Sequence, residues 1–181
     1  MQREYHRPRV GVSACLLGEA VRYNGGHKRH AWLVETLGRE VEWVSVCPEM
    51  ELGLGTPRET IDLVRVTDGD VRLLTTRTRI DLTDRMRRFA ADRVEALASM
   101  DLSGYVLKAD SPSCGLSGVP VTGSDNTGRG LFAEALVARL AELPVIDERA
   151  LDDPDRRAAF IARVHAYHPS TASRRGDKMR R

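Results

Sequence analysis

The chain has 181 residues, of which 41% are hydrophobic and 30% are charged. This composition is typical of a soluble globular protein and excludes an intrinsically disordered chain or a protein made mainly of membrane-spanning segments. The length suits one domain with a sizeable core, and the formal net charge is only +2.

Positive charge is concentrated at the two ends of the chain. Residues 1–9 carry three arginines and one glutamate, residues 174–181 carry five basic residues and one aspartate, and the stretch between them is net acidic. The apolar run before Cys15, Val10-Gly11-Val12, is too short for the core of an export signal. We therefore expect a cytoplasmic protein with no membrane association, a basic arm at 1–8 and a disordered basic tail at 170–181.

The first half of the chain predicts two strands that each lead to a cysteine. Arg9–Ala14 is a short apolar run that ends at Cys15, and Val41–Val46 is rich in β-branched and aromatic residues and ends at Cys47-Pro48. Between them, His27–Leu37 has apolar residues at helical spacing. The next stretch, Glu49–Glu59, contains glycines and a proline and reads as a loop.

The second half continues the alternation of strands and helices. Ile61–Val66 and Val71–Thr75 flank Asp68-Gly69 and predict a hairpin. After it we expect three helices and two short strands: a helix over 81–100, a strand over 105–108, a helix over 130–143, a strand over 144–146 and a helix over 156–167.

Alternating strands and helices predict a single α/β domain with a mainly parallel sheet flanked by helices, a Rossmann-like three-layer arrangement. We place this domain at 9–150, with a helical extension at 151–169. In such sheets, ligands bind beyond the carboxyl ends of the strands. Cys15, Cys47 and Cys114 each follow a predicted strand, so we expect their thiols to meet at one edge of the sheet.

The presence of three cysteines, and not four, limits the kinds of metal centre that they could bind. An odd number of cysteines in a chain with no export signal argues against a disulfide framework. Structural zinc usually takes four ligands, often as Cys-x-x-Cys pairs, although a histidine could complete such a site. A cubane iron-sulfur cluster also normally takes four thiolates, so three would leave one iron open to substrate. Buried cysteines acting only as small apolar residues are the plain alternative.

Two polar residues lie close to these cysteines in sequence. Glu49 is two residues after Cys47 and is a candidate general base for activating a water. Ser111 is three residues before Cys114 and could donate to a developing oxyanion or relay a proton. Ser113 competes for that role, and either serine could instead cap the turn. Gly128-Arg129-Gly130, just before a predicted helix, is a weak signal for an anion cradle.

Three ordered motifs carry a family resemblance, and together they are far more specific than any one alone. They are Val12-Ser13-Ala14-Cys15-Leu16-Leu17-Gly18 followed by Val21-Arg22-Tyr23, then Val46-Cys47-Pro48-Glu49, and finally the run from Lys108 to Gly115. With them the chain resembles the thiouracil desulfidase family over about residues 9–150.

The resemblance implies that Cys15, Cys47 and Cys114 bind a 4Fe-4S cluster whose open iron takes the sulfur of a thiolated pyrimidine, while water attacks the carbon without net electron transfer. Glu49 and Ser111 match the family's catalytic positions. The implied substrates are thiolated nucleobases or nucleosides, such as 2-thiouracil, 4-thiouracil or 4-thiouridine.

Other segments are similar to the first half of longer two-domain proteins that act on 4-thiouridine in tRNA. These segments are Gly25–Arg29, Glu42–Val44, Leu151–Pro154 and Phe160–Val164. Because this chain ends at Arg181, we expect it to lack the second domain of those proteins. Thiolated tRNA is nevertheless a candidate partner, whereas DNA is not expected.

Two other functions are also compatible with three cysteines at strand ends. The three thiolates could hold a cluster or zinc in a non-catalytic structural or redox-sensing module, which would need neither Glu49 nor Ser111. Alternatively, Cys114 could be the nucleophile of a hydrolase with His27 or His30 as base. The hydrolase reading leaves Cys15 and Cys47 without a role.

Overall fold

The computed structural model describes residues 7–178, and it describes side chains as far as residue 168. Within these residues, one sheet is entirely parallel and has the strand order β2-β1-β5-β8. Its strands are β1 (Arg9–Ser13), β2 (Glu42–Val46), β5 (Leu102–Leu107) and β8 (Val145–Asp147). The expected parallel sheet is therefore present, and its central strand β5 is buried along its whole length.

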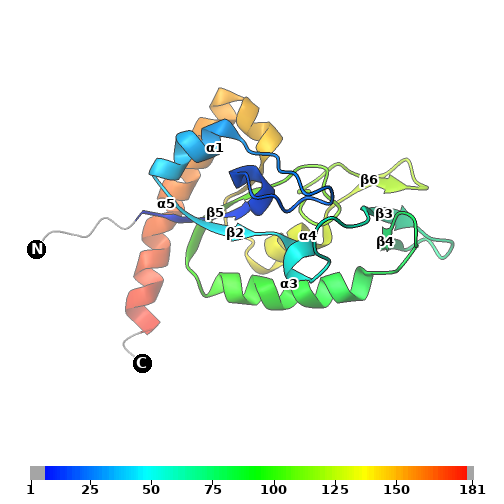
Figure 1. The fold of residues 1–181 in the computed structure, drawn as a ribbon. Coiled ribbons are helices and arrows are strands. Elements are labelled where there is room, and N and C mark those ends of the chain that lie inside the picture. The colour runs from blue at the N-terminus through cyan, green and yellow to red at the C-terminus, as the bar shows by residue number, and fades with distance from the viewer. Residues whose placement is uncertain (1–6, 179–181) are drawn as a thin grey trace, which may run out of the picture.

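Helices cover both faces of the parallel sheet and make the expected three layers (Figure 1). On one face, α3 and α4 pack with Tyr105 and Leu107 of β5, and on the other, α1 and α5 pack with Val106. The helices are α1 (Ala31–Glu35), α2 (Pro48–Glu51), α3 (Thr83–Ala98), α4 (Leu131–Arg139) and α5 (Pro154–Lys178), with 3-10 turns η1 (Ala14–Leu17), η2 (Leu37–Arg39) and η3 (Glu148–Asp152).

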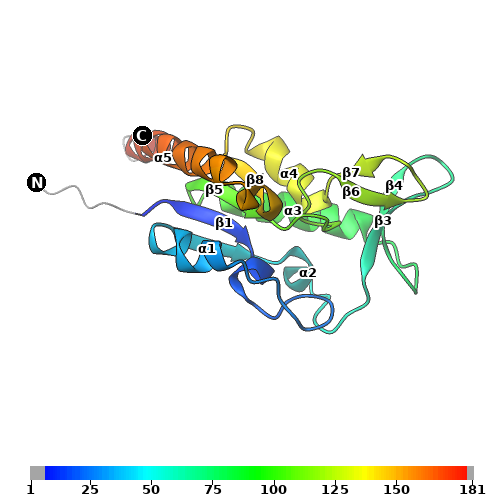
Figure 2. The ribbon, with the colours of Figure 1, turned by 90° about the horizontal axis from the view of Figure 1, so that it is seen from above.

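A second sheet lies at one end of the molecule, on the right in Figures 1 and 2. Its strand order is β4-β3-β6-β7. The strands are β3 (Ile61–Arg65), β4 (Val71–Thr75), β6 (Val119–Thr122) and β7 (Thr127–Gly128). The hairpin of β3 and β4 is the one expected around Asp68-Gly69. Strands β6 and β7 were not expected, because two to four residues that alternate buried and exposed leave little periodic signal.

The order of the parallel strands creates a topological switch at β1. The chain leaves β1 for β2 on one side and later returns to place β5 on the other side. The connection to β2 passes through α1 on one face, and the connection to β5 passes through α3 on the opposite face. A crevice at the carboxyl ends of β1 and β5 follows from this divergence, and it is the usual place for a ligand in open α/β sheets.

Two helices differ from their expected bounds for local reasons. Residues 27–30 stay extended instead of beginning α1, because Lys28 and His30 donate their backbone N–H groups to the carbonyls of Cys15 and Leu16, each at 2.9 Å. The expected loop after Cys47 begins instead with α2, since Pro48 at its first position suits a helix start.

At the C-terminal end, the backbone of α5 continues to Lys178, past the boundary at residue 169 expected from the sequence. Its described side chains Phe160 and Val164 are buried against the parallel sheet. The basic arm at 1–8 and the basic tail at 170–181 fall largely outside the residues whose side chains are described. Over the described residues, no helix combines the length and apolar character needed to cross a bilayer.

Candidate active site

A cavity of about 450 Å³ opens at the carboxyl ends of the parallel strands. Residues from the ends of β1, β2 and β5 line it, together with the loops after α2 and η1. The structure brings all five sequence-predicted site residues to this cavity: Cys15, Cys47, Glu49, Ser111 and Cys114. Residues that lie up to 99 positions apart in the chain therefore share one wall because three parallel strands end at the same edge.

Cys15 is held by the 3-10 turn η1, which begins immediately after β1. Its carbonyl accepts hydrogen bonds from the backbone N–H groups of Gly18, at 3.3 Å, and Lys28, at 2.9 Å. Gly18 ends the turn with a φ of 97°, a left-handed conformation that glycine adopts without strain. The Cys15 side chain is 8% exposed. Its position is thus fixed by the backbone on both sides of the loop that follows.

Cys47 stands between the end of β2 and the start of α2. Its Sγ lies 3.6 Å from Oε2 of Glu49 and 3.9 Å from the carbonyl oxygen of Val21, and the thiol can donate to either. Because Pro48 starts a helical turn, Glu49 folds back toward the thiol that precedes it. The short helix α2, which the sequence did not predict, therefore sets the contact between the carboxylate and the thiol.

Cys114 lies in a tight loop after β5 that rests on the start of α4. Ser111 Oγ accepts from the backbone N–H of Ser113 at 3.2 Å and of Cys114 at 3.0 Å. The N–H groups at the start of α4 donate to the same loop, at 3.1 Å from Leu131 to the Pro112 carbonyl and at 3.0 Å from Phe132 to the Ser113 carbonyl. These bonds use the helix N-terminus, so it is not the anion cradle suggested by its Gly-x-Gly sequence.

The two candidate serines have different positions. Ser111 lines the cavity, and because its oxygen accepts two N–H groups, its own proton is left to donate. Ser113 is fully buried behind the loop, and its hydroxyl has no hydrogen-bond partner among the described residues. The geometry favours Ser111 over Ser113 as the group that meets a substrate.

The environment of the three thiols keeps them protonated when no metal is present. Burial, reinforced by the Glu49 carboxylate, raises the pKa of Cys47 to about 12. Burial raises the pKa of Cys15 to about 11, against the opposing effect of the Lys108 ammonium. The pKa of Cys114 lies well above its ordinary value, because of burial and then of Glu49, although a hydrogen bond from Ser13 lowers it.

Three thiols beside a carboxylate, two of them buried and that of Cys47 half-buried, form a donor set suited to a cationic group that replaces the thiol protons. Sulfur is a soft ligand that favours zinc, copper or iron-sulfur centres. Over residues 7–168, whose side chains are described, no three His, Cys, Asp or Glu side chains are grouped as ligands of a single metal ion. The thiols are instead distributed around a cavity, and their chemistry fits an iron-sulfur cluster that occupies part of it.

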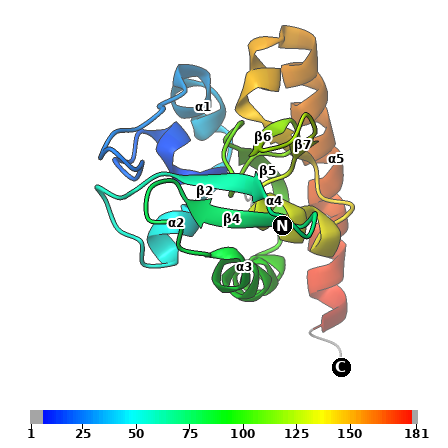
Figure 3. The ribbon, with the colours of Figure 1, turned by 90° about the vertical axis from the view of Figure 1, so that its right-hand side faces the viewer.

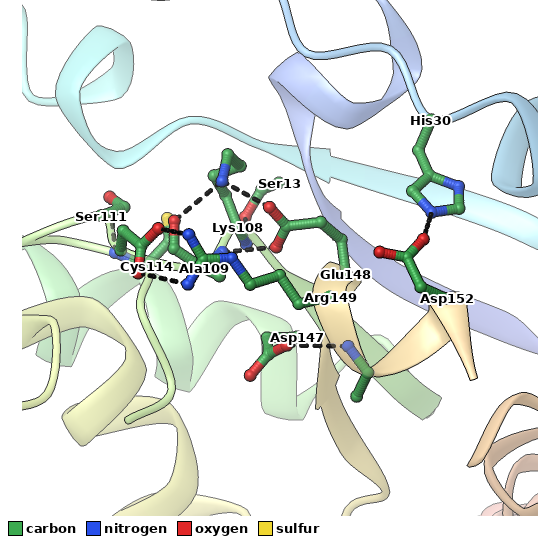
Figure 4. A network of polar contacts seen from close by, with 12 residues as sticks. Ser13, His30, Lys108, Ala109, Ser111, Cys114, Asp147, Glu148, Arg149 and Asp152 are labelled. Atoms are coloured by element: carbon green, nitrogen blue, oxygen red, sulfur yellow. Dashed lines mark hydrogen bonds and ion pairs between the residues drawn. The ribbon is translucent and has the colours of Figure 1, made fainter. Parts of the chain in front are cut away.

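Two residues that line the cavity, Ser13 and Lys108, were not predicted from the sequence, and they belong to one polar network with Glu148 behind them (Figure 4). Ser13 Oγ accepts from the backbone N–H of Lys108 at 3.0 Å. The Lys108 ammonium forms an ion pair with Glu148, which directly follows β8. The sequence does carry a signal for Glu148, because this residue directly follows the last parallel strand and ligands gather at the carboxyl ends of such strands.

The two histidines considered as bases for a Cys114 nucleophile do not line the cavity. His30 pairs with Asp152 at 3.8 Å, and Nδ1 of His27 accepts the backbone N–H of Arg29 at 3.2 Å. The Cys114 thiol also has a raised pKa, which is the opposite of what a nucleophilic cysteine needs. The structure therefore gives no support to a cysteine hydrolase.

Taken together, these features define a class of protein: an α/β domain with a cavity, lined by three free thiols, at the carboxyl edge of a parallel sheet. The 2-thiouracil desulfurase family profile matches residues 10–148, a span that contains all three cysteines. The chain belongs to this family, and the membership expected from its motifs is confirmed.

Two relatives illustrate the match. The chain is 33% identical over 149 residues to the protein YbbK of Bacillus subtilis strain 168, an alignment that covers 78% of this chain and 97% of YbbK. Its fold is similar to the solved structure of TudS, a 4Fe-4S-dependent thiouracil desulfidase, with a TM-score of 0.65 and 30% identity over 86% of this chain and 99% of that chain. The two matches extend over nearly the whole length of both relatives, and the match to TudS shows that the fold is shared with it.

Proposed function

We propose that this protein is a 4Fe-4S-dependent desulfidase that replaces the sulfur of a thiolated pyrimidine by oxygen, with Cys15, Cys47 and Cys114 as cluster ligands. The observation that carries the proposal is the meeting of three free thiols, a carboxylate and a hydroxyl on one cavity at the switch point of the sheet. Membership of the thiouracil desulfurase family and the likeness to TudS support it.

The overall reaction converts a thiocarbonyl and water into a carbonyl and hydrogen sulfide. The carbon–sulfur bond breaks and a carbon–oxygen bond forms, and the oxidation states of carbon, sulfur and oxygen do not change. A cluster held by three thiolates would supply one iron without a cysteine, a Lewis acid with affinity for the substrate sulfur. The remaining steps require groups that move protons, and the cavity contains two that are suitably placed.

Glu49 is the candidate general base. Its carboxylate lies beside the Cys47 thiol and acts electrostatically on all three cysteines, so it faces the place where the cluster would lie. From its position beside Cys47, the Glu49 carboxylate can take a proton from a water that attacks the substrate carbon. A general base of this kind typically contributes about 10²–10⁴ in rate.

Ser111 is the candidate donor to the substrate. Two backbone N–H groups hold its oxygen, which leaves the hydroxyl proton directed elsewhere, and the residue lines the cavity. A hydroxyl held in this way can donate to an oxygen or ring nitrogen of the substrate that gains negative charge during the attack.

The substrate is a small thiolated nucleobase or nucleoside, with 2-thiouracil, 4-thiouracil and 4-thiouridine as the candidates and thiolated tRNA as a larger one. A volume of about 450 Å³ lies within the usual range for sites that bind small molecules. A reducing cytoplasmic location suits this chemistry, because all three cysteines are required as thiolates and an oxidising compartment would favour disulfides.

The test is anaerobic reconstitution of the purified protein with iron and sulfide, followed by measurement of sulfide release from each candidate substrate. Cys114→Ser should lose both cluster and turnover. Glu49→Gln should keep the cluster spectrum and reduce turnover by about 10²–10⁴. As a control, Glu95→Gln removes an exposed ion pair with Arg139 and should behave like the wild type.

Two results would contradict the proposal in different ways. Full activity of Glu49→Gln would remove that residue from the mechanism. A reconstituted cluster that releases no sulfide from any substrate would favour the non-catalytic, redox-sensing module instead.

A further inference from the structure

A partly buried ion pair joins the end of β8 to the loop that carries Cys114 (Figure 4). Glu148 pairs with the Lys108 ammonium through Oε1 and accepts the backbone N–H of Ala109 through Oε2. Lys108 Nζ also donates to the Ala109 carbonyl at 2.8 Å. The side chain of Lys108 is only 19% exposed and that of Glu148 only 12%. Both polar groups of the Ala109 backbone are therefore held by one ion pair.

Ala109 is the point at which the chain leaves β5 and enters the loop. The next residue, Asp110, has a φ of 57°, a left-handed conformation that is uncommon outside glycine. Ser111 and Cys114 follow within four residues and both line the cavity. The path of the loop after this turn depends on how Ala109 is oriented. Contacts that fix Ala109 therefore also help to fix Ser111 and Cys114.

The same pair lies within electrostatic reach of the Cys15 thiol. The Lys108 ammonium lowers the pKa of Cys15, against the larger effect of burial, whereas the Glu148 carboxylate raises it, in the same direction as burial. The two charges therefore act on this thiol in opposite directions. Removing one of them would leave the other uncompensated in a site shielded from water, where a lone charge has a large effect.

We propose that Glu148 is a positioning residue of the candidate active site. Through Lys108 and Ala109 it holds the loop over residues 109–115 in the conformation that presents Ser111 and Cys114 to the cavity, and it balances the Lys108 charge there. The loop-holding role stands on the metal-free structure, whereas the charge-balancing role rests on the proposed cluster.

The loop-holding role is tested on the metal-free protein by hydrogen exchange of the amides of residues 113–115. Glu148→Ala removes a carboxylate that makes two contacts with one turn, so these amides should exchange roughly tenfold faster or more, relative to the slowest core amides. The control is Val164→Ala, which shortens a buried side chain of α5 that packs on β5 near Gly104. It should lower global stability without changing this ratio.

The charge-balancing role is tested on the reconstituted protein by the midpoint potential of the cluster. Glu148→Gln leaves Lys108 uncompensated and should shift the potential to a more positive value. Lys108→Met leaves Glu148 uncompensated and should shift it to a more negative value. If Glu148 and Lys108 served folding alone, their two variants would not shift the potential in opposite directions. Val164→Ala should not shift it.

The loop-holding role would be overturned if the amides of residues 113–115 exchanged no faster in Glu148→Ala than in the wild type. It would also be overturned if their exchange relative to the core amides rose equally in Val164→Ala. Potentials that shift in the same direction in Glu148→Gln and Lys108→Met would overturn the charge-balancing role. If the wild-type protein takes up no cluster, the proposed function and the charge-balancing role both fail, and the exchange measurement still decides whether Glu148 holds the loop.

Discussion

Tyr105 combines two opposing contributions in one side chain. Its ring is fully buried, lies 6.0 Å from the Phe132 ring between centroids, and packs so closely on Gly11 that a Cβ there would stand 2.2 Å from the ring. Its hydroxyl has no hydrogen-bond partner among the described residues. The ring therefore stabilises the core, whereas the hydroxyl is buried without a partner among the described side chains and backbone groups, which costs free energy.

Tyr105→Phe should consequently stabilise the metal-free protein. Removing an unpaired buried hydroxyl should raise the free energy of unfolding by about 1–3 kcal/mol, because the desolvation cost disappears while the ring remains. Urea unfolding followed by far-UV circular dichroism measures the change. The matched control is Ser103→Ala on the same strand. The buried Ser103 hydroxyl lies 3.2 Å from Nδ1 of His168, so its removal should lower the free energy of unfolding. Destabilisation by Tyr105→Phe would mean that the hydroxyl has a partner.

At the scale of elements, the start of α4 and the Cys114 loop form one unit. The loop carbonyls of Pro112 and Ser113 accept the N–H groups that a helix start otherwise leaves unpaired. This close approach requires glycine at position 130, where a Cβ would lie 2.4 Å from the Ser113 carbonyl. The Gly-x-Gly sequence that suggested an anion site thus serves the contact between the helix and the loop.

Gly130→Ala should therefore disturb the candidate cluster site without touching a cysteine. Because the added methyl meets rigid backbone, we expect a loss of about 1–3 kcal/mol in unfolding free energy and reduced iron binding on reconstitution. Gly128→Ala is the matched control, since its Cβ would meet only the ends of the Leu63 and Val121 side chains, at 3.2 and 3.3 Å. Equal iron content and stability in the two variants would contradict this account.

The start of α3 provides a pH-dependent contribution. Asp81 accepts the backbone N–H of Thr83 at 2.9 Å and pairs with Arg72 at 3.3 Å. Hydrogen bonds from Thr83 and then the Arg72 charge hold the pKa of this carboxyl below its ordinary value of 3.8. A carboxyl with a lowered folded-state pKa stabilises the protein above its unfolded-state pKa and loses that effect as the pH falls through the folded-state value.

Asp81→Ala should accordingly lower stability by about 1 kcal/mol at neutral pH, as the loss of a helix cap does. The difference from the wild type should shrink below pH 3.8, where the carboxyl of the unfolded chain is already protonated. Urea unfolding at a series of pH values measures it, with the exposed Asp92→Ala as a control that should show little effect. A difference that stays constant down to pH 2 would contradict the assignment.

Across the whole molecule, the two sheets are joined through α3. Its C-terminal part packs under the parallel sheet, while Met86 near its start belongs to the buried cluster of the second sheet, and Phe89 contacts both clusters. Figure 3 shows α3 beneath the sheets when the molecule is viewed from the end that carries β3 and β4. The two sheets are therefore expected to unfold together.

Leu73→Ala tests this coupling. Leu73 is fully buried in the second sheet, so its truncation should lower the free energy of unfolding by about 2–5 kcal/mol. Both tryptophans, Trp32 and Trp43, pack on the parallel-sheet side. The tryptophan fluorescence and far-UV circular dichroism transitions should shift by the same amount if unfolding is cooperative. Separate transitions in Leu73→Ala would show that the sheets unfold independently, and the exposed Arg65→Ala serves as control.

The sequence by itself determined the parallel sheet, the hairpin after β3 and the three cysteines at strand ends, because each depends on short-range patterns of apolar residues and turns. It also singled out Glu49 and Ser111, which lie within three residues of a cysteine. The helical turn that brings Glu49 to the Cys47 thiol was missed, since four residues carry no periodic signal.

Only the tertiary structure decided how these pieces meet. Three features depend on contacts between segments far apart in sequence: the access of Ser111 but not of Ser113 to the cavity, the use of the α4 N-terminus by loop carbonyls, and the Glu148–Lys108 pair. The physical reason is that a strand end specifies which edge of a sheet a residue occupies, whereas burial and hydrogen bonding at that edge depend on neighbours that the strand pattern does not encode.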